Sequence, residues 1–252
     1  ETLRERLKLS TSMSRQFVAI TRSSRSSPPG STGDAMSKAN DLKKKQREIR
    51  AAFPESLGLR VHRSISWLQR AEKDAEDLDI CFILLWISFN SAYASDIEST
   101  DAGERESFKR FFGLLVKLDN KHRIYDAVWA RFSQEIRILL DNKYIFGPFW
   151  SHQNGIPGYE RWEERLMASK RSLTQAIKNY DTPMILAILF DRLYVLRNQI
   201  IHGGATWNSS VNRRQLQDGV AVLSWLLPVF IDIMMDHPRE DWGKPFYPVI
   251  ST

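Results

Sequence analysis

A permanent cation, an amide and an imidazole lie close together in one short stretch, as Arg197, Asn198 and His202. Cleavage of RNA without a metal needs a base for the 2′-hydroxyl proton, an acid for the 5′-oxygen and a cation for the phosphorane. Histidine suits proton transfer, arginine suits bidentate contact with phosphate, and asparagine can orient either group. These three residues are therefore the candidate catalytic residues.

The helix expected from Pro183 to His202 must position these groups. Asn198 and His202 are four residues apart and share one face, which Tyr194 borders as a candidate substrate contact. Two further residues share this face: Asp191 and Val195. Arg197 precedes His202 by five residues, so a regular helix separates the two by about 140°. A long reach of the arginine, or a distorted last turn, would have to bring them together.

The spacing alone is a weak indication of catalysis. In a chain with 23 arginines and five histidines, about one arginine is followed by a histidine four to six residues later by chance. A histidine at the end of a helix also commonly caps carbonyl groups. An alternative is therefore that the chain is a helical interaction protein in which the motif has no catalytic role.

Two further features resemble a known family. Asn198 directly follows the motif arginine, and an earlier apolar stretch contains Trp86, Phe89 and Tyr93 in the order Trp-x-x-Phe-x-x-x-Tyr. With the Arg-x4-6-His pattern near the end of the chain, these residues resemble the HEPN superfamily, and in particular its Apea-like branch. The resemblance covers roughly residues 50 to 236.

The resemblance implies a metal-independent endoribonuclease that leaves a 2′,3′-cyclic phosphate, with Arg197, Asn198 and His202 as its catalytic residues. It also implies a homodimer whose motif helices meet at a composite cleft, and a role in toxin–antitoxin biology or antiphage defence. The expected partners are RNA, either tRNA or mRNA, and an antitoxin protein. Many members of the superfamily are inactive, so the alternative is a non-catalytic module that binds a nucleotide or a cognate antitoxin or other partner protein.

The segment after His202 supplies further candidates for RNA binding. Trp207 could stack on a base, and Asn208, Arg213 and Arg214 could contact the backbone. The alternative is structural: Trp207 packs over the end of the helix, and Asn208 or Ser210 caps the next one.

The net charge of +6 is not spread over the whole chain. Residues 1–60 contain 13 basic and six acidic residues, whereas the remainder contains 23 and 24. RNA contacts in the main domain must therefore come from a local patch. The basic run 43–47 is interpreted as a solvated helix face, and the acidic cluster at 74–79 as a solvated loop.

No metal, cofactor or membrane is expected. The histidines outside the motif share no ligand spacing, and the chain has no P-loop and no dinucleotide-binding glycine motif. The one cysteine, Cys81, lies in an apolar run and reads as buried, which favours a cytoplasmic protein. No apolar run reaches the roughly 18 residues of a membrane span, and no signal peptide is recognised.

The pattern predicts an all-α bundle in residues 36–242, and the resemblance implies that this bundle is HEPN-like. Residues 1–35 are expected to form a flexible basic leader or linker, which is not native if Met36 is the true start. Residues 243–252 are expected to form an extended tail. Loops are expected at 101–103 and, as an irregular insertion, at 143–159. The expected helices are 37–52, 57–73, 78–95, 104–118, 123–142, 160–179, 183–202 and a last one after Ser210 to Asp236, kinked at Pro228.

Overall fold

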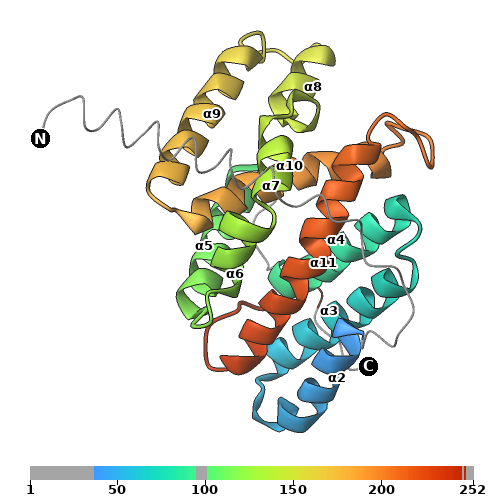
Figure 1. The fold of residues 1–252 in the computed structure, drawn as a ribbon, viewed down its shortest axis with the longest axis vertical. Coiled ribbons are helices and arrows are strands. Elements are labelled where there is room, and N and C mark those ends of the chain that lie inside the picture. Colours follow the sequence, from blue (N-terminus) through green and yellow to red (C-terminus); the bar gives the residue numbers. More distant parts are fainter. Residues whose placement is uncertain (1–36, 95–100, 246, 248–252) are drawn as a thin grey trace, which may run out of the picture. The chain divides into compact units, whose positions relative to one another are not determined.

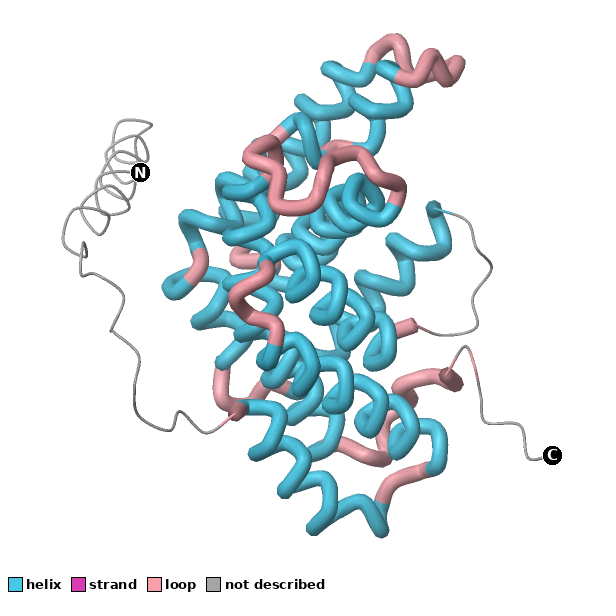
Figure 2. The backbone as a smooth tube through the Cα atoms, turned by 90° about the vertical axis from the view of Figure 1, so that its right-hand side faces the viewer, coloured by secondary structure: helices cyan, strands magenta, loops and turns pink. Residues whose placement is uncertain are grey.

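The computed structural model describes residues 37–94, 101–245 and 247, with side chains described from Ser107 onward in the second range. The expected leader, residues 1–35, lies outside the described residues, as do 246 and 248–252 of the expected tail. Helices connected by turns and loops make up this part of the chain, and no strand occurs in it (Figure 2). The prediction of an all-α fold is confirmed.

The helices are numbered as in Figure 1. The first five are α2 (Lys38–Ile49), α3 (Glu55–Lys73), α4 (Leu78–Tyr93), α5 (Asp101–Leu118) and α6 (Arg123–Asp126). The last five are α7 (Ser133–Asp141), α8 (Gly147–Gln153), α9 (Trp162–Lys178), α10 (Thr182–Ile201) and α11 (Arg213–Asp236). Short 3₁₀ turns occupy Arg50–Ala52 and Lys143–Ile145, and a π-helical turn occupies Ala127–Arg131.

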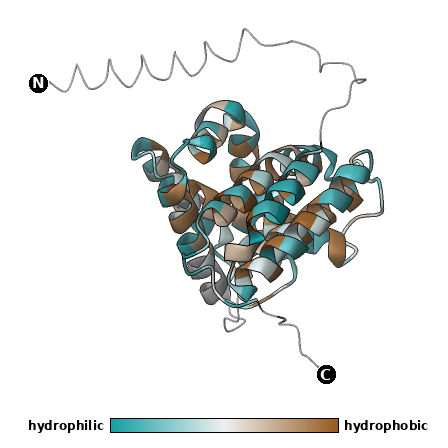
Figure 3. Ribbon diagram, turned by 90° about the horizontal axis from the view of Figure 1, so that it is seen from below, coloured by the Kyte–Doolittle hydropathy of each residue, from teal (hydrophilic) through white to brown (hydrophobic). Residues whose placement is uncertain are grey.

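Helix α4 packs against α3 and α11, and α11, which also contacts α2 and α7, runs through the middle of the bundle (Figure 1). Helix α4 is apolar nearly all round, as expected of a helix with neighbours on several sides. The stripe predicted on α3, Leu57, Val61, Ile65 and Leu68, is buried against it. Polar residues lie on the outward faces of the surrounding helices (Figure 3).

A cluster of aromatic rings ties α10 to the rest of the core. Phe190 of α10 is fully buried, and its ring centroid lies 4.4 Å from that of Phe89 on α4 and 4.7 Å from that of Phe112 on α5. The ring of Phe230 on α11 lies 6.2 Å away. Aromatic pairs at these separations add to the stability gained from burial. The cluster therefore fixes the helix that carries the candidate catalytic residues.

Arg60 of α3 is a buried cation that holds three backbone carbonyls. Its guanidinium donates to Ala92 O at 3.0 Å, to Gly243 O at 3.1 Å and to Lys244 O at 2.6 Å. Burial lowers the pKa of Arg60 to about 10, so the group remains charged at neutral pH. The residues after α11 are thereby bound to α3 and to the end of α4.

The prediction of a loop at residues 101–103 is wrong, because Asp101 begins α5 and Gly103 lies in the first turn of this helix. A glycine in a helix costs only about 1 kcal/mol relative to alanine. The packing of α5 against α10 is sufficient to outweigh that cost.

Two other expectations in the middle of the chain are wrong. Residues 123–142 do not form one α-helix, because the π-helical turn Ala127–Arg131 separates α6 from α7 and Phe132 takes a non-helical conformation. Residues 143–159 are not wholly irregular, because they contain a 3₁₀ turn and α8. Gly147 and Pro148 begin α8 rather than mark a loop, since proline is well suited to the first turn of a helix.

Within the described residues, α11 alone is long and apolar enough to cross a membrane. Of the apolar 18-residue window of α11 that meets this test, 67% is buried in the protein. Pro228 lies inside this helix.

Cys81 is buried, as predicted, and burial raises the pKa of its thiol to about 11.

Candidate functional site

Both ends of α10 are fixed by local interactions that the sequence predicts. At its start the Asp181 carboxylate accepts a hydrogen bond from the Met184 backbone N–H at 3.0 Å. At its end Gly203 N–H donates to Ile200 O at 3.1 Å and Gly204 N–H donates to Gln199 O at 2.7 Å. This is the Schellman arrangement, in which the residue after the C-cap is left-handed. Helix α10 therefore ends at a defined point.

Each of the two glycines is required for this stop. Gly203 has a φ of +69°, a conformation that side chains with a Cβ rarely adopt. A Cβ at Gly204 would lie 3.0 Å from Gln199 O, closer than most real contacts of that kind. His202, immediately before them, is the C-cap residue, and its N–H donates to Asn198 O at 2.9 Å.

Arg197 and Asn198 form a pair on the surface of α10. The Arg197 guanidinium donates to Asn198 Oδ1 at 2.8 Å, and its Cζ lies 5.8 Å from the ring centroid of Tyr194. Trp86 of α4 lies behind Tyr194, with its ring centroid 6.1 Å away. In the described structure Arg197 Nε is buried and has no hydrogen-bond partner. The structure therefore brings together three of the residues predicted to form the site.

His202 is exposed at the end of the same helix, and the described residues offer its imidazole no hydrogen bond or ion pair. Because α10 is regular up to Ile201, His202 and Arg197 leave the helix about 140° apart. The last turn is not distorted in a way that would bring the two together. One copy of the chain therefore presents the candidate acid–base group and the candidate cation on different sides of α10.

The loop after His202 is anchored to the start of α4 by two carboxylates. Asp77 Oδ1 caps α4, accepting from the backbone N–H groups of Asp79 and Ile80, while its Oδ2 accepts from Trp207 Nε1 at 2.8 Å. The hydrogen bond from Ile80 N–H and that from the Trp207 indole lower the pKa of Asp77. The interpretation of this acidic cluster as a solvated loop is therefore wrong at Asp77, which caps α4, and at Asp79, which is buried within α4.

Asp79 binds two of the residues predicted to contact RNA. Its Oδ2 accepts from Arg213 at 2.7 Å and from the backbone N–H of Asn208 at 3.2 Å, and its side chain is buried. The charge of Arg213 is therefore paired within the protein. The Trp207 side chain is 72% exposed, and the hydrogen bond from its indole nitrogen to Asp77 holds this exposed ring in place.

The remaining candidates occupy other positions. Arg214 is exposed, and its charge acts on Asp218, whose pKa is raised by burial. Asn208 and Ser210 do not cap α11, because the residue before that helix is Asn212. Asn212 Nδ2 instead donates to Gln199 Oε1 at 2.9 Å, which joins the loop back to α10.

These contacts predict that Asp79 stabilises the loop more than its neighbours do. An Asp79→Asn variant leaves Arg213 without its carboxylate, and we expect it to lower the free energy of unfolding by about 1–3 kcal/mol. Glu76→Gln makes the same change of charge at an exposed position and should cost less than about 0.5 kcal/mol. Urea denaturation measures both values, and equal losses would contradict the anchoring role of Asp79.

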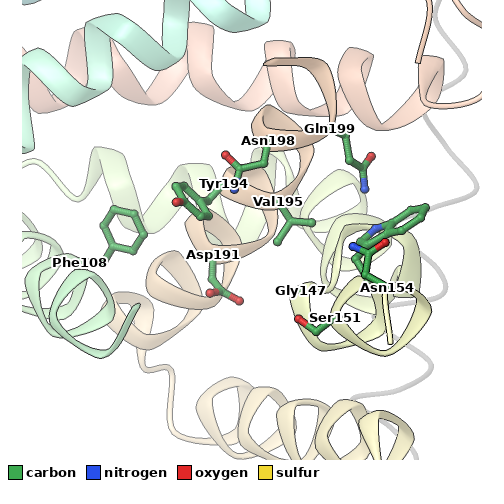
Figure 4. Close-up of a pocket in the computed structure, with 10 residues that line it drawn as sticks. Phe108, Gly147, Ser151, Asn154, Asp191, Tyr194, Val195, Asn198 and Gln199 are labelled. Atoms are coloured by element: carbon green, nitrogen blue, oxygen red, sulfur yellow. The ribbon is translucent and has the colours of Figure 1, made fainter. Parts of the chain in front are cut away.

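A groove lies along α10, between α8 and α5 (Figure 4). Its volume is about 410 Å³, within the range typical of small-molecule sites. Its polar and aromatic lining comes from Asp191, Tyr194 and Asn198 of α10 and from Trp150, Ser151 and Asn154 of α8. The sequence pattern does not predict this groove, because it predicts an irregular insertion where α8 forms one wall. The position of Asp191, on the face of α10 that carries Asn198 and His202, was the available signal.

Comparison of the chain with models of protein families, with curated proteins and with solved structures finds no match. Among the described residues no group of histidine, cysteine, aspartate and glutamate is arranged to hold a metal ion. The chemistry of the site must therefore be inferred from its own side chains.

Proposed function

We propose that the chain is a metal-independent endoribonuclease of the HEPN type, which cleaves RNA by attack of the 2′-hydroxyl and leaves a 2′,3′-cyclic phosphate. One observation carries the proposal. A firmly terminated helix presents an exposed histidine with no partner among the described residues at its end, one turn beyond a paired arginine and asparagine. Cation, amide and imidazole are the groups that this reaction needs.

The roles follow from the contacts of each side chain. Asn198 holds the Arg197 guanidinium through one of its NH₂ groups, which leaves the other available to a phosphate oxygen. His202 is open to solvent and can exchange protons with the 2′-hydroxyl and the 5′-oxygen. Arg197 then stabilises the charge of the phosphorane.

The divergence of Arg197 and His202 favours an active site completed by a second copy of the chain. In a symmetric dimer the same surface occurs on both partners, so Arg197 of one copy can face His202 of the other. Large apolar side chains are exposed at the end of α10 and in the loop that follows it: Ile201 at 50%, Trp207 at 72% and Val211 at 72%. Exposed large apolar side chains are common where proteins contact one another.

Cleavage of total RNA by the purified full chain, with EDTA present throughout, tests the proposal. We expect fragments that end in a cyclic phosphate from the wild type, and a loss of about 10²–10⁴ in rate for His202→Ala because the proton-transfer group is removed. His152→Ala provides the control, since His152 is also exposed and lies outside the motif.

Cleavage that EDTA abolishes, or that His202→Ala retains, would contradict the proposal. A wild-type protein that binds RNA or a nucleotide and never cleaves would favour the alternative, a non-catalytic HEPN-like module.

A further inference from the structure

The basic run at residues 43–47 divides between two sides of α2. Lys45 faces α11, where its ammonium group forms ion pairs with two aspartates, so the interpretation as a solvated face is wrong at this residue. Lys43 and Arg47 are four residues apart, and Arg50, seven residues after Lys43, begins the 3₁₀ turn that follows the helix. These three side chains therefore share one face, on the other side of the helix from Lys45.

His62 of α3 meets this face of α2. Lys43 Nζ donates to His62 Nδ1 at 3.0 Å and to Gln46 Oε1 at 2.9 Å. An ammonium group has three N–H donors, so Lys43 keeps one for a ligand. Because His62 accepts at Nδ1, its proton lies on Nε2, and the side chain is exposed. Together, Lys43, Arg47, Arg50 and His62 form the basic patch.

The groups of the basic patch are close to one another and lack counter-ions. Among the described residues, no carboxylate forms an ion pair with Lys43, Arg47 or Arg50. Burial lowers the pKa of Lys43, and the charges of Arg47 and Arg50 lower it further. Burial and the charges of Lys43 and Arg50 likewise lower the pKa of His62. An anion that binds among these groups would relieve their mutual repulsion.

The basic patch suits the phosphate backbone of a nucleic acid. Arginine is well suited to phosphate, because its guanidinium can contact two oxygens at once. Cations at positions i, i+4 and i+7 form a row about 10 Å long, which a chain of phosphates can follow. Helices that bind a membrane surface carry large apolar side chains beside their charges, whereas no large apolar side chain of residues 37–62 is exposed.

The basic patch lies far from the candidate catalytic residues. Lys45, on the other side of α2, pairs with the C-terminal end of α11, whereas the loop after His202 leads into the start of α11 (Figure 1). Helix α11 has 24 residues and is therefore about 36 Å long. At about 3.4 Å for each stacked nucleotide, this length corresponds to roughly ten nucleotides.

We propose that the basic patch is a second RNA-binding surface, which holds backbone phosphates roughly ten nucleotides away from the bond cleaved at His202. Its contacts are to phosphate alone, so it strengthens the binding of any sequence and selects none. This inference rests on the proposed function for the choice of RNA as the nucleic acid and for the position of the cleaved bond.

Binding of an RNA that cannot be cleaved tests the basic patch without any catalysis. A labelled single strand with 2′-O-methyl groups, about three times the span of roughly ten nucleotides, lacks the 2′-hydroxyl that attacks. Fluorescence anisotropy gives its affinity for the full chain at several salt concentrations. The double variant Arg47→Gln, Arg50→Gln should lower the slope of log affinity against log salt by about 1.4, because each phosphate contact to a single strand contributes about 0.7. At about 0.1 M salt the affinity should fall roughly 10–30-fold.

Two controls separate the position and the charge of these arginines from a general effect. The double variant Arg161→Gln, Arg171→Gln removes the same charge from exposed positions at α9, and should change the affinity by less than about threefold. The double variant Arg47→Lys, Arg50→Lys keeps the charge of the basic patch and should keep the salt slope of the wild type.

An unchanged salt slope in the Arg47→Gln, Arg50→Gln protein, or no binding of RNA by the wild type, would overturn the RNA-binding surface. Retained RNA binding by this variant, with loss of binding to phosphatidylserine vesicles, would also overturn it and assign the patch to a membrane. The two proposals fail separately. Binding that requires Arg47 and Arg50 in a protein that never cleaves would leave the patch and remove the nuclease, whereas cleavage with an unchanged salt slope would do the reverse.

Discussion

An Arg197→Lys variant is expected to lose RNA cleavage nearly as fully as Arg197→Ala, by about 10²–10³-fold. The guanidinium of Arg197 already donates to Asn198 Oδ1 with one NH₂ group and has further donors in the same plane for phosphate. Lysine carries a single charged nitrogen, which cannot keep the bond to Asn198 and contact the phosphate in the same geometry. Initial rates on a defined RNA measure the loss.

The control for this prediction is Arg171→Lys, because Arg171 is exposed on α9 and is not among the candidate site residues. It should change the rate by less than about threefold, as expected where only charge matters. Full activity in Arg197→Lys would contradict the role of Arg197 in orienting the phosphate.

Mixing two inactive variants would test whether the active site is shared between copies. If Arg197 of one copy acts with His202 of the other, a dimer of Arg197→Ala with His202→Ala retains one intact site. Random exchange of subunits should then restore about a quarter of the wild-type rate. No recovery, in a mixture that is shown to exchange subunits, would require both residues to act from one chain.

A Phe190→Ala variant is expected to lose about 3–5 kcal/mol of stability, the largest effect on folding predicted for this chain. Phe190 is fully buried, and its ring meets those of Phe89, Phe112 and Phe230 from three other helices. Removing it opens a cavity at the point where α4, α5, α10 and α11 come together. Urea denaturation followed by circular dichroism gives the change.

Met167→Ala is a suitable comparison for Phe190→Ala, because Met167 is 56% exposed on α9 and should cost less than about 0.5 kcal/mol. A loss below about 1.5 kcal/mol for Phe190→Ala would mean that the aromatic cluster does not hold α10 in place.

The ends of α10 could be predicted from sequence because their causes are local. Asp181 and Pro183 start the helix, and Gly203 and Gly204 stop it, through contacts within a few residues. The buried stripe on α3 could be predicted for the same reason, since helical periodicity alone determines which residues share a face.

The expectations that were wrong depend on contacts between distant segments. Gly103 is helical because α5 packs on α10, and α6 is separated from α7 by a π-helical turn whose Trp129 donates to Thr182 Oγ1 at 2.9 Å. The sequence contains no local signal for either. The same holds for the bonds of Asp77 and Asp79 to the loop after His202, which join residues about 130 positions apart.

The same distinction between local causes and distant contacts applies to the candidate site. The separation of Arg197 from His202 follows from helix geometry and could be predicted. The hydrogen bond from Arg197 to Asn198 joins adjacent residues, which do not face each other on a helix, so helix geometry does not predict it. The pairing of Arg213 with Asp79 and the wall that α8 supplies to the groove could not be predicted, because each needs a second element to be placed correctly.

The hydrogen bonds of Arg60 limit how far the chain can be shortened from its C-terminal side without loss of stability. Two of the three carbonyls that accept from this buried guanidinium belong to Gly243 and Lys244, which follow α11. A version that stops at Trp242 would contain all of α11 and still leave a buried positive charge with a single acceptor, at Ala92. A fusion or an affinity tag should therefore be joined beyond Lys244, because a protease that removes Gly243 and Lys244 would leave the buried charge of Arg60 with one acceptor and so destabilise the protein.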